Sequence, residues 1–312
     1  MSYTKLFDPL AAPLPEPGPA GMGTATRIAD RSDTVAYVYS DAVVLAVNLA
    51  LATGRPLLVR GPSGTGKSSL ARDLARRTGR VLTEVQMTSR IEAQDLLWQF
   101  DAIRRLQDAQ VQQLKPDAAY IRPGPLWIAF DKHSAAAQTA AYRRGAAPQD
   151  GDNGARPPAA QPAVLLIDEI DKADPDVPNN LLTVLGNLAF MVEPLGQTIA
   201  CEQPPLVVIT TNDERDMPAA FVRRCIELVI PFPDRAQLEA IAMAHFPDFD
   251  PATLARLADL AITAMEAERS GVSTAEFLDL VQACAELGIT SEDEMFGLVI
   301  DATLTKSRFA SR

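Results

Sequence analysis

The chain has 312 residues, of which 47% are hydrophobic and 22% are charged, a balance typical of a soluble globular protein with a sizeable core. Forty acidic residues against 29 basic ones give a net charge of −11, which disfavours a protein that binds nucleic acid over a whole face. The three cysteines are far apart and only two histidines are present, so neither a disulfide framework nor a zinc site is indicated.

The first segment of the chain, residues 1–34, is rich in proline and alanine. Proline at this density removes backbone donors and fixes φ, so we expect an extended, disordered leader. The segment lacks the basic and then apolar order of a signal peptide, and no apolar run in the sequence is long enough to cross a membrane. These features favour a cytoplasmic location.

Helices and short apolar strands are predicted next. Asp41 can cap a helix that Gly54 ends, and a second helix is expected over residues 67–78. A hairpin is predicted over residues 190–200. Apolar strands are predicted at residues 55–60, 81–87, 163–167, 206–210 and 228–230. Together these elements indicate an α/β unit.

Two changes of composition divide the chain. Residues 134–162 consist largely of Ala, Gln, Gly, Pro, Asp and Arg without a periodic apolar face, which indicates a low-complexity, disordered insertion. Beyond residue 233 the pattern is wholly helical, and three helix starts carry a capping aspartate, a first-turn proline or capping-box spacing. These starts are at Asp234, at Asp250-Pro251, and at Ser273–Glu276, with a fourth expected at Ser291–Glu294. We therefore expect a core over residues 35–233 and a helical domain over 234–312.

The segment Gly61–Ser69, GPSGTGKSS, satisfies the GxxxxGK[ST] pattern between a predicted strand and a predicted helix. Its glycines let the backbone curl so that N–H groups point at phosphate oxygens, and the following helix adds its positive end. Lys67 would reach the β- and γ-phosphates of ATP, and the Ser68 hydroxyl would hold Mg²⁺. The predicted nucleotide-binding residues of this phosphate loop are Gly61, Ser63, Gly64, Thr65, Gly66, Lys67, Ser68 and Ser69.

Polar side chains end the two most apolar strands. Asp168 and Glu169 follow a strand that is apolar enough to lie in the middle of a parallel sheet, so both would emerge at its carboxyl edge. Asp168 would bind Mg²⁺ through water, and Glu169 would orient and polarise an attacking water. Asn212 ends the next strand, where a neutral amide can hydrogen-bond the same water or the γ-phosphate.

Two adjacent arginines, Arg223 and Arg224, precede the last strand. They can be plain surface charge, or one of them can reach the nucleotide of a neighbouring subunit and neutralise charge at the γ-phosphate. We favour the second interpretation, with Arg224 as the better candidate for this arginine finger.

In this order the motifs resemble those of an AAA+ ATPase, and more narrowly those of the MoxR-like branch. The matching segments are RPLLVRGPSGTGKS, GPLW, LLIDEIDKAD and TTNDERDMPAAFVRRC. The resemblance implies a P-loop AAA+ fold: a doubly wound αβα core followed by an all-helical lid, with an extra hairpin for which Leu96–Pro125 has room. It further implies that Asn212 is the first sensor.

The resemblance also implies a cofactor and partners. Proteins of the branch that this chain resembles use ATP and Mg²⁺, typically form hexameric rings with ATP between subunits, and remodel or assemble a protein partner. That partner is often a protein with a von Willebrand factor A domain. We therefore expect a homo-oligomeric ATPase with a protein client and without a membrane partner.

One departure keeps other functions open. Many relatives carry a second sensor arginine at the start of a lid helix, where this chain has Ala275 after Ser273-Thr274. A regulatory scaffold or switch with little ATP turnover is therefore an alternative to a remodelling motor. A nucleic-acid motor is a third interpretation, which the acidity of the chain disfavours.

Overall fold

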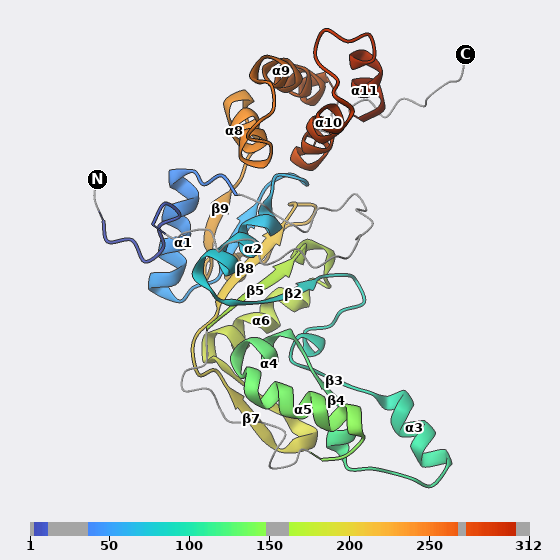
Figure 1. Ribbon diagram of the computed structural model, residues 1–312. Helices are drawn as coiled ribbons and strands as arrows, with labels where there is room; N and C mark the ends of the chain where they lie inside the picture. Colours follow the sequence, from blue (N-terminus) through green and yellow to red (C-terminus); the bar gives the residue numbers. More distant parts are fainter. Residues whose placement is uncertain (1–2, 12–36, 148–161, 268–272, 304–312) are drawn as a thin grey trace. The chain divides into compact units, whose positions relative to one another are not determined.

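The computed structural model describes residues 3–11, 37–147, 162–267 and 273–303, which form two compact units (Figure 1). The described residues of the first unit lie in 1–14, 41–60 and 74–228, and those of the second lie in 15–40, 61–73 and 229–312. The predicted boundary at residue 233 is therefore incomplete, because residues 61–73, the phosphate loop and the start of its helix, group with the C-terminal helices. The hydrogen bond from the Thr274 N–H to the Gly64 carbonyl, at 3.0 Å, is one reason for this grouping.

A five-stranded sheet forms the middle of the first unit, with the strand order β2-β5-β8-β1-β9. The β1–β8, β8–β5 and β5–β2 pairs are parallel, and the registers Arg60↔Thr211 and Gln86↔Asp168 bring their carboxyl ends to one edge. Every residue of β8 is buried, as are the first five of β5, because both strands have neighbours on either side. The strand bounds are β1 Leu57–Arg60, β2 Val81–Gln86, β5 Ala163–Asp168, β8 Leu206–Thr211 and β9 Ile226–Val229. This α/β fold confirms the predicted class.

Helices and two small hairpins complete the first unit. The predicted hairpin forms from β6 (Ala189–Val192) and β7 (Gln197–Ala200). Phe190 of β6 lies at ring distances of 6.3 Å from Trp127 and 6.1 Å from Phe130, so these aromatic side chains pack in the core. The helix bounds are α1 Asp41–Thr53, α2 Lys67–Thr78, α3 Ala102–Gln110, α4 Pro125–Phe130, α5 Lys132–Arg144, α6 Asp176–Asn187 and α7 Ala219–Val222, with 3₁₀ turns at Gln94–Leu96, Asp117–Tyr120, Ile170–Lys172 and Glu193–Leu195.

The predicted disordered insertion is wrong over its first third, where α5 forms. Asp131 caps this helix by accepting the N–H of Ser134, and Gly145 ends it with a φ of 68°. Small alanine side chains give α5 a flat buried face, and the Gln138 amide donates to the carbonyls of Ala118 and Ile121. Alanine has the highest helix propensity, so the composition that resembled low complexity forms a helix instead. The remainder of the insertion, residues 148–161, lies outside the described residues.

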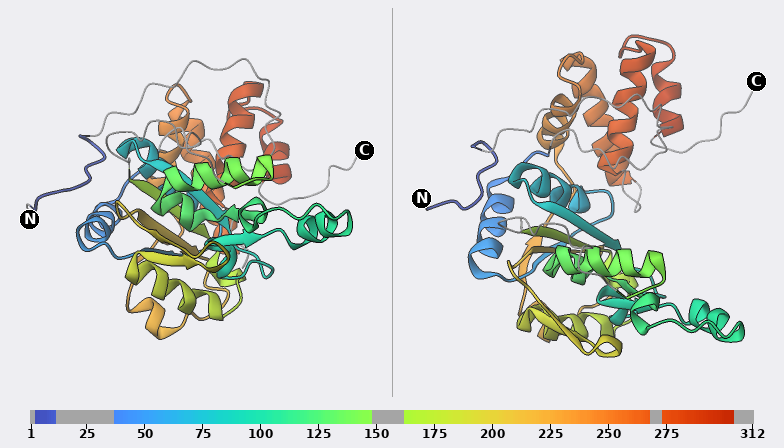
Figure 2. Two further views of the ribbon diagram at one scale, coloured as in Figure 1. Left: turned by 90° about the horizontal axis from the view of Figure 1, so that it is seen from below. Right: turned by 60° about the horizontal axis from the view of Figure 1, so that its bottom comes forward.

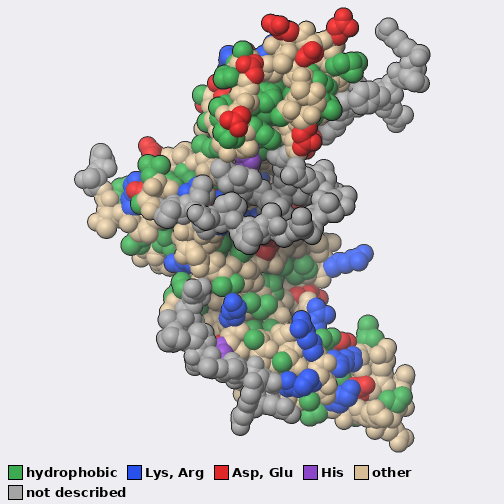
Figure 3. Space-filling view, viewed as in Figure 1, with side chains coloured by type: hydrophobic (Ala, Val, Ile, Leu, Met, Phe, Trp, Pro, Cys, Tyr) green, Lys and Arg blue, Asp and Glu red, His purple; other side chains and the backbone are tan. Residues whose placement is uncertain are grey.

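An extra antiparallel pair, β3 (Trp98–Phe100) and β4 (Ile121–Pro123), occupies the segment expected to hold a hairpin, with α3 between its strands. Helix α3 has no buried residue and projects away from the sheet of its own unit (Figures 1 and 2). Lysine and arginine side chains gather over this segment (Figure 3), and Arg105 and Arg122 are among its exposed residues.

The predicted leader is also wrong at its beginning. Phe7 is buried, and the side chain of Asn48 in α1 binds the backbone on both sides of it. The Asn48 carbonyl oxygen accepts the N–H groups of Leu6 and Phe7 at 2.6 and 2.8 Å, and its amide donates to the Phe7 carbonyl. Residues 12–36, the proline-rich part, lie outside the described residues.

Four helices with their own apolar core make up most of the second unit: α8 Arg235–His245, α9 Pro251–Ala267, α10 Thr274–Leu287 and α11 Phe296–Thr303. The predicted capping box starts α10 at Ser273, and the predicted cap Asp234 starts α8, where it also forms a capping box with Gln237. The capping box expected at Ser291 does not form, because Asp293 instead accepts the N–H and hydroxyl of Thr290 within a turn. Among the described residues, no helix combines the length and apolar character that crossing a membrane requires.

Candidate functional site

The carboxyl edge of the sheet carries the predicted acidic pair. Asp168 is the last residue of β5, and Glu169 follows it with a φ of 56°, in the left-handed region. The Thr210 hydroxyl of β8 donates to Asp168 Oδ1 at 2.5 Å and accepts the Glu169 N–H at 2.9 Å. One hydroxyl therefore fixes both the carboxylate of Asp168 and the turn that aims Glu169.

The two carboxylate oxygens of Glu169 have different partners. Oε2 accepts from Gln86 Nε2 at 2.9 Å and from Lys172 Nζ at 2.8 Å, whereas Oε1 lies 3.4 Å from Asn212 Nδ2. Burial raises the pKa of Glu169, but the Lys172 ammonium and the hydrogen bonds from Gln86 and Asn212 outweigh it, so the pKa lies below its ordinary value. Glu169 is therefore an anion at neutral pH, with Oε1 as the less occupied oxygen.

Asn212 begins a short loop after β8 that several side chains hold. The backbone N–H of Asn212 donates to Asp171 Oδ2 at 3.1 Å. The next residue, Asp213, has a φ of 59° and pairs with Arg60 at 2.9 Å. Arg60 also pairs with Glu227 of β9 at 3.0 Å, and its hydrogen bond to Asp213 raises its pKa. The structure thus brings together the predicted residues Asp168, Glu169 and Asn212.

The phosphate loop follows β1 directly in the chain and belongs to the second unit. Gly61, Gly64 and Gly66 have φ values of 147°, 77° and 86°, which side-chain-bearing residues rarely adopt. Within the loop, Lys67 Nζ donates to the carbonyls of Gly61 and Pro62 at 2.8 and 2.7 Å. Lys67 is also the first residue of α2, so the predicted loop and helix N-terminus are both present.

The start of α10 lies directly on this loop. A Cβ placed on Gly64 would come within 2.2 Å of the Ser273 Cβ, so only glycine fits there. The Thr274 N–H donates to the Gly64 carbonyl at 3.0 Å. Ala275, at the position where the sequence resemblance implies a sensor arginine, is exposed. The contact between this helix and the loop therefore includes a backbone hydrogen bond that does not depend on the side chain at position 275.

The two candidate finger residues, Arg223 and Arg224, are exposed in the turn between α7 and β9. Their backbone is held by Arg55, whose guanidinium donates to the carbonyls of Arg223, Arg224 and Cys225. Burial raises the pKa of the Cys225 thiol to about 12, so this neighbour is a neutral packing group. The turn is fixed while both arginine side chains remain accessible.

Sequence reasoning missed four residues of the site: Gln86, Asp171, Lys172 and Thr210. Lys172 stands three residues after Glu169, a spacing that brings side chains together on one helical turn, so its charge could have been noticed. Gln86 and Thr210 depend on the register between strands, which one sequence does not reveal.

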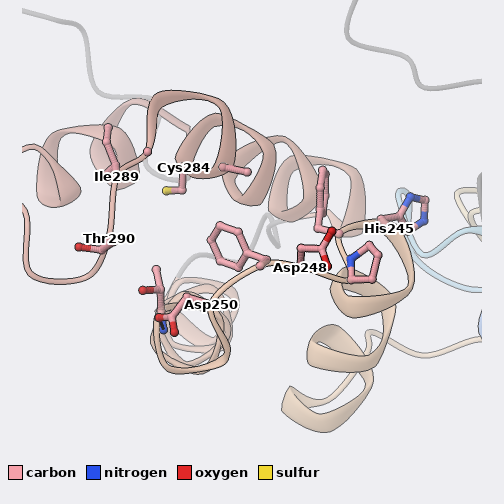
Figure 4. A pocket seen from close by; sticks show the side chains of 12 residues that line it. His245, Asp248, Asp250, Cys284, Ile289 and Thr290 are labelled. Carbon is pink, nitrogen blue, oxygen red and sulfur yellow. Dashed lines mark hydrogen bonds between the residues drawn. The ribbon is translucent and has the colours of Figure 1, made fainter.

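Among its described residues, the second unit also contains an apolar pocket of about 450 Å³ (Figure 4). His245, Asp248 and Asp250 line it from the end of α8 and the connection to α9, and Cys284, Ile289 and Thr290 line it from α10 and beyond. Asp250 already accepts the Thr253 N–H at 2.7 Å, and burial raises the pKa of Cys284. Among the described residues, no cluster of three or more His, Cys, Asp and Glu could hold a metal ion.

Comparison with known proteins gives one family and several similar folds. The family model described as "AAA domain (dynein-related subfamily)" matches residues 56–225. Among solved structures, a point mutant of Thermotoga maritima RuvB is 16% identical, with a TM-score of 0.48, over 84% of this chain and 68% of that chain. The FIGL-1 AAA domain in complex with ADP is 17% identical, with a TM-score of 0.40, over 78% of this chain and 65% of that chain. The chain thus spans about two thirds of the length of these two chains.

Proposed function

The chain belongs to the AAA domain family of the dynein-related subfamily, and from that premise we propose that it is a Mg²⁺-dependent ATPase. It binds ATP at the phosphate loop, hydrolyses it with Glu169 as the water-activating carboxylate, and uses the cycle to remodel or assemble a protein partner. The MoxR-like motifs of the sequence support its assignment to that branch of AAA+ proteins.

The observation that carries this proposal is the position of Glu169 beside Asn212. A carboxylate whose Oε2 is bound by Gln86 and Lys172 presents Oε1 in a fixed direction, with the Asn212 amide 3.4 Å away. A carboxylate and an amide that converge can accept a proton from, and orient, one water molecule. This pair supports hydrolysis as well as binding.

The phosphate loop supports ATP as the substrate. Lys67 is only 6% exposed and donates to two loop carbonyls, which it can exchange for the β- and γ-phosphate oxygens when a nucleotide enters. Backbone N–H groups around Gly64 and Gly66 and the start of α2 would bind the same anion. Ser63, Thr65 and Ser69 line or follow this curve and are proposed as further contacts.

The donor set supports Mg²⁺ as the cofactor. The Ser68 hydroxyl and the Asp168 carboxylate are hard oxygen donors, which Mg²⁺ prefers, and the Thr210 hydroxyl fixes the direction of Asp168. Ser68 would bind the ion directly and Asp168 through a water, which is sufficient where substrate phosphates and waters complete the shell. When bound, the metal ion neutralises charge on the phosphate oxygens.

We propose a homo-oligomeric ring, probed most directly through Arg224. The exposed side chain on a turn held by Arg55 suits a group that acts on the ATP of a neighbouring copy. The MoxR-like motifs support a hexamer as the form of this ring and a protein with a von Willebrand factor A domain as its client. A switch with little turnover is the second candidate, favoured by the exposed Ala275 where a sensor arginine would stand.

Binding and turnover of ATP test this proposal. We expect the purified chain to bind a fluorescent ATP analogue and release phosphate in the presence of Mg²⁺. Lys67→Ala should weaken analogue binding by at least about tenfold, because the ammonium group that would contact the β- and γ-phosphates is lost. Lys132→Ala is the matched control, since Lys132 is an exposed lysine of α5. Equal binding by Lys67→Ala and the wild type would refute the phosphate-loop assignment, whereas tight binding without turnover would favour the switch.

A further inference from the structure

Asp171 is a buried acidic residue that the proposed chemistry leaves without a role. It lies in the 3₁₀ turn after β5, with 2% of its surface exposed. Its Oδ2 atom accepts two backbone N–H groups from the loop after β8, that of Asn212 at 3.1 Å and that of Glu214 at 3.2 Å. One carboxylate oxygen therefore holds two peptide groups, 41 and 43 residues further along the chain.

The backbone between these two N–H groups has a special conformation. Asp213 lies between Asn212 and Glu214 with a φ of 59°, in the left-handed region. A left-handed residue in such a turn lets the peptide N–H groups on its two sides point into one concavity, which binds anions. The carboxylate of Asp171 fills this concavity. It thereby fixes the segment from which the Asn212 side chain extends towards Glu169.

The remaining oxygen of Asp171 argues against a purely structural role. Oδ1 is buried and has no hydrogen-bond partner among the described residues. A buried carboxylate oxygen without a hydrogen bond costs free energy, so this residue is a poor choice for stability alone. The neighbouring ammonium of Lys172 binds Glu169 at 2.8 Å rather than Asp171.

We propose that Asp171 is a positioning residue for hydrolysis: by holding the loop after β8, it keeps the Asn212 amide beside Glu169. The inference rests on the proposed ATPase function. It predicts that Asp171 affects the chemical step through Asn212 and leaves the affinity for ATP unchanged.

A double-mutant cycle in the full chain tests this coupling. Asp171→Ala should lower kcat by at least about tenfold with KM for ATP within about twofold, because a group needed only for the chemical step is displaced. In the Asn212→Ala background the same change should lower kcat by less than about twofold, because the two residues act as one unit. Losses that multiply in the double variant, or an unchanged kcat in Asp171→Ala, would overturn the proposal.

Two further variants separate positioning from folding. Asp171→Asn keeps one oxygen acceptor for both N–H groups and should recover kcat to within about threefold of the wild type. Asp174→Ala is the matched control, since Asp174 is exposed and accepts the N–H of Asp176, at 3.0 Å, within its own turn. A loss of kcat in Asp174→Ala as large as that in Asp171→Ala would contradict a specific role of Asp171.

Amide hydrogen exchange provides a readout that needs no turnover. The amides of Asn212 and Glu214 should exchange at least about tenfold faster in Asp171→Ala than in the wild type, and at unchanged rates in Asp171→Asn and Asp174→Ala. If the wild type showed no ATPase activity, the proposed function would fail, but faster exchange in Asp171→Ala would still show that Asp171 holds the loop after β8. Unchanged exchange in Asp171→Ala would overturn the proposal that Asp171 holds this loop, even in an active ATPase.

Discussion

The side-chain amide of Asn212 lies 3.4 Å from Oε1 of Glu169. Lys172 and Gln86 bind the other carboxylate oxygen, Oε2. The two oxygens of this carboxylate are therefore distinct in the folded protein. Oε2 anchors the side chain, and Oε1 is presented together with an amide. This asymmetry suits the proposed hydrolysis, in which one group would accept the proton of the attacking water while the other fixes its orientation.

The pH dependence of hydrolysis should reflect the partners of Glu169. Its pKa is lowered in the folded protein, so the carboxylate is ionised at neutral pH and kcat should fall only as the pH drops through that lowered value. Lys172→Met removes the cation while burial, which raises the pKa, remains. The acidic limb of the kcat profile should therefore move to higher pH.

Kinetic profiles of Lys172→Met and Lys132→Met check this sign. Lys132 is an exposed lysine of α5, so its replacement should leave the limb in place. If the acidic limb of the kcat profile is unchanged in Lys172→Met, or moves to lower pH, Glu169 is not the group whose ionisation controls turnover.

The backbone contact between α10 and the phosphate loop should affect ATP affinity. Thr274 is the first residue of α10, a position where proline is well tolerated, and Ser273 before it has a ψ of 155°, which suits a pre-proline residue. Thr274→Pro therefore preserves the helix but removes the N–H that donates to the Gly64 carbonyl, because the proline ring carbon Cδ takes the place of its hydrogen. We expect ATP to bind roughly three- to tenfold more weakly, because the loop is displaced.

Thr274→Ala is the matched control, since it keeps the N–H and removes only the side-chain hydroxyl and γ-methyl groups. Titration with a fluorescent ATP analogue, together with denaturant unfolding, separates the two variants. Equal affinities for Thr274→Pro and Thr274→Ala at equal stability would show that this contact does not influence the loop.

Mixing two inactive variants tests the arginine finger. Arg224→Ala lacks the proposed finger and Glu169→Gln lacks the proposed base, so each alone should be nearly inactive. In mixed oligomers, about one quarter of the interfaces combine an intact Glu169 with an intact Arg224 from the neighbour, and activity should return in proportion. Phosphate release measured across mixing ratios gives the answer.

The corresponding mixture of Arg223→Ala with Glu169→Gln is the control that separates the two arginines. No recovery in either mixture, under conditions in which the subunits exchange, would argue against a residue acting across an interface.

Much of the core was predictable because its signals are local. Strands β5 and β8 begin as apolar runs that lead towards Asp168 and Asn212, and the glycines of the loop permit the positive φ values that its curve requires. The class of the fold and the positions of the polar residues at its sheet edge follow from these runs.

The errors arise where a local pattern has two meanings. The alanines of α5 resemble low complexity in composition, but Asp131 and Gly145 cap them into a helix that buries Ala135 and Ala141. The proline-rich beginning gave no sign that Phe7 would be buried, since its partner Asn48 is distant in sequence. Asp171 was overlooked because its role depends on the conformation of Asp213, which only the structure reveals.

We propose that Glu169 activates water while other residues bind ATP, and a single pair of measurements on Glu169→Gln tests this division of roles. The substitution keeps the size of the side chain, but it removes the charge and replaces one of the two acceptor oxygens with an amide donor. We predict that it binds ATP with an affinity within about threefold of the wild type, while steady-state phosphate release falls by at least about a hundredfold. Undiminished hydrolysis in Glu169→Gln, or an equal loss of binding, would contradict this account.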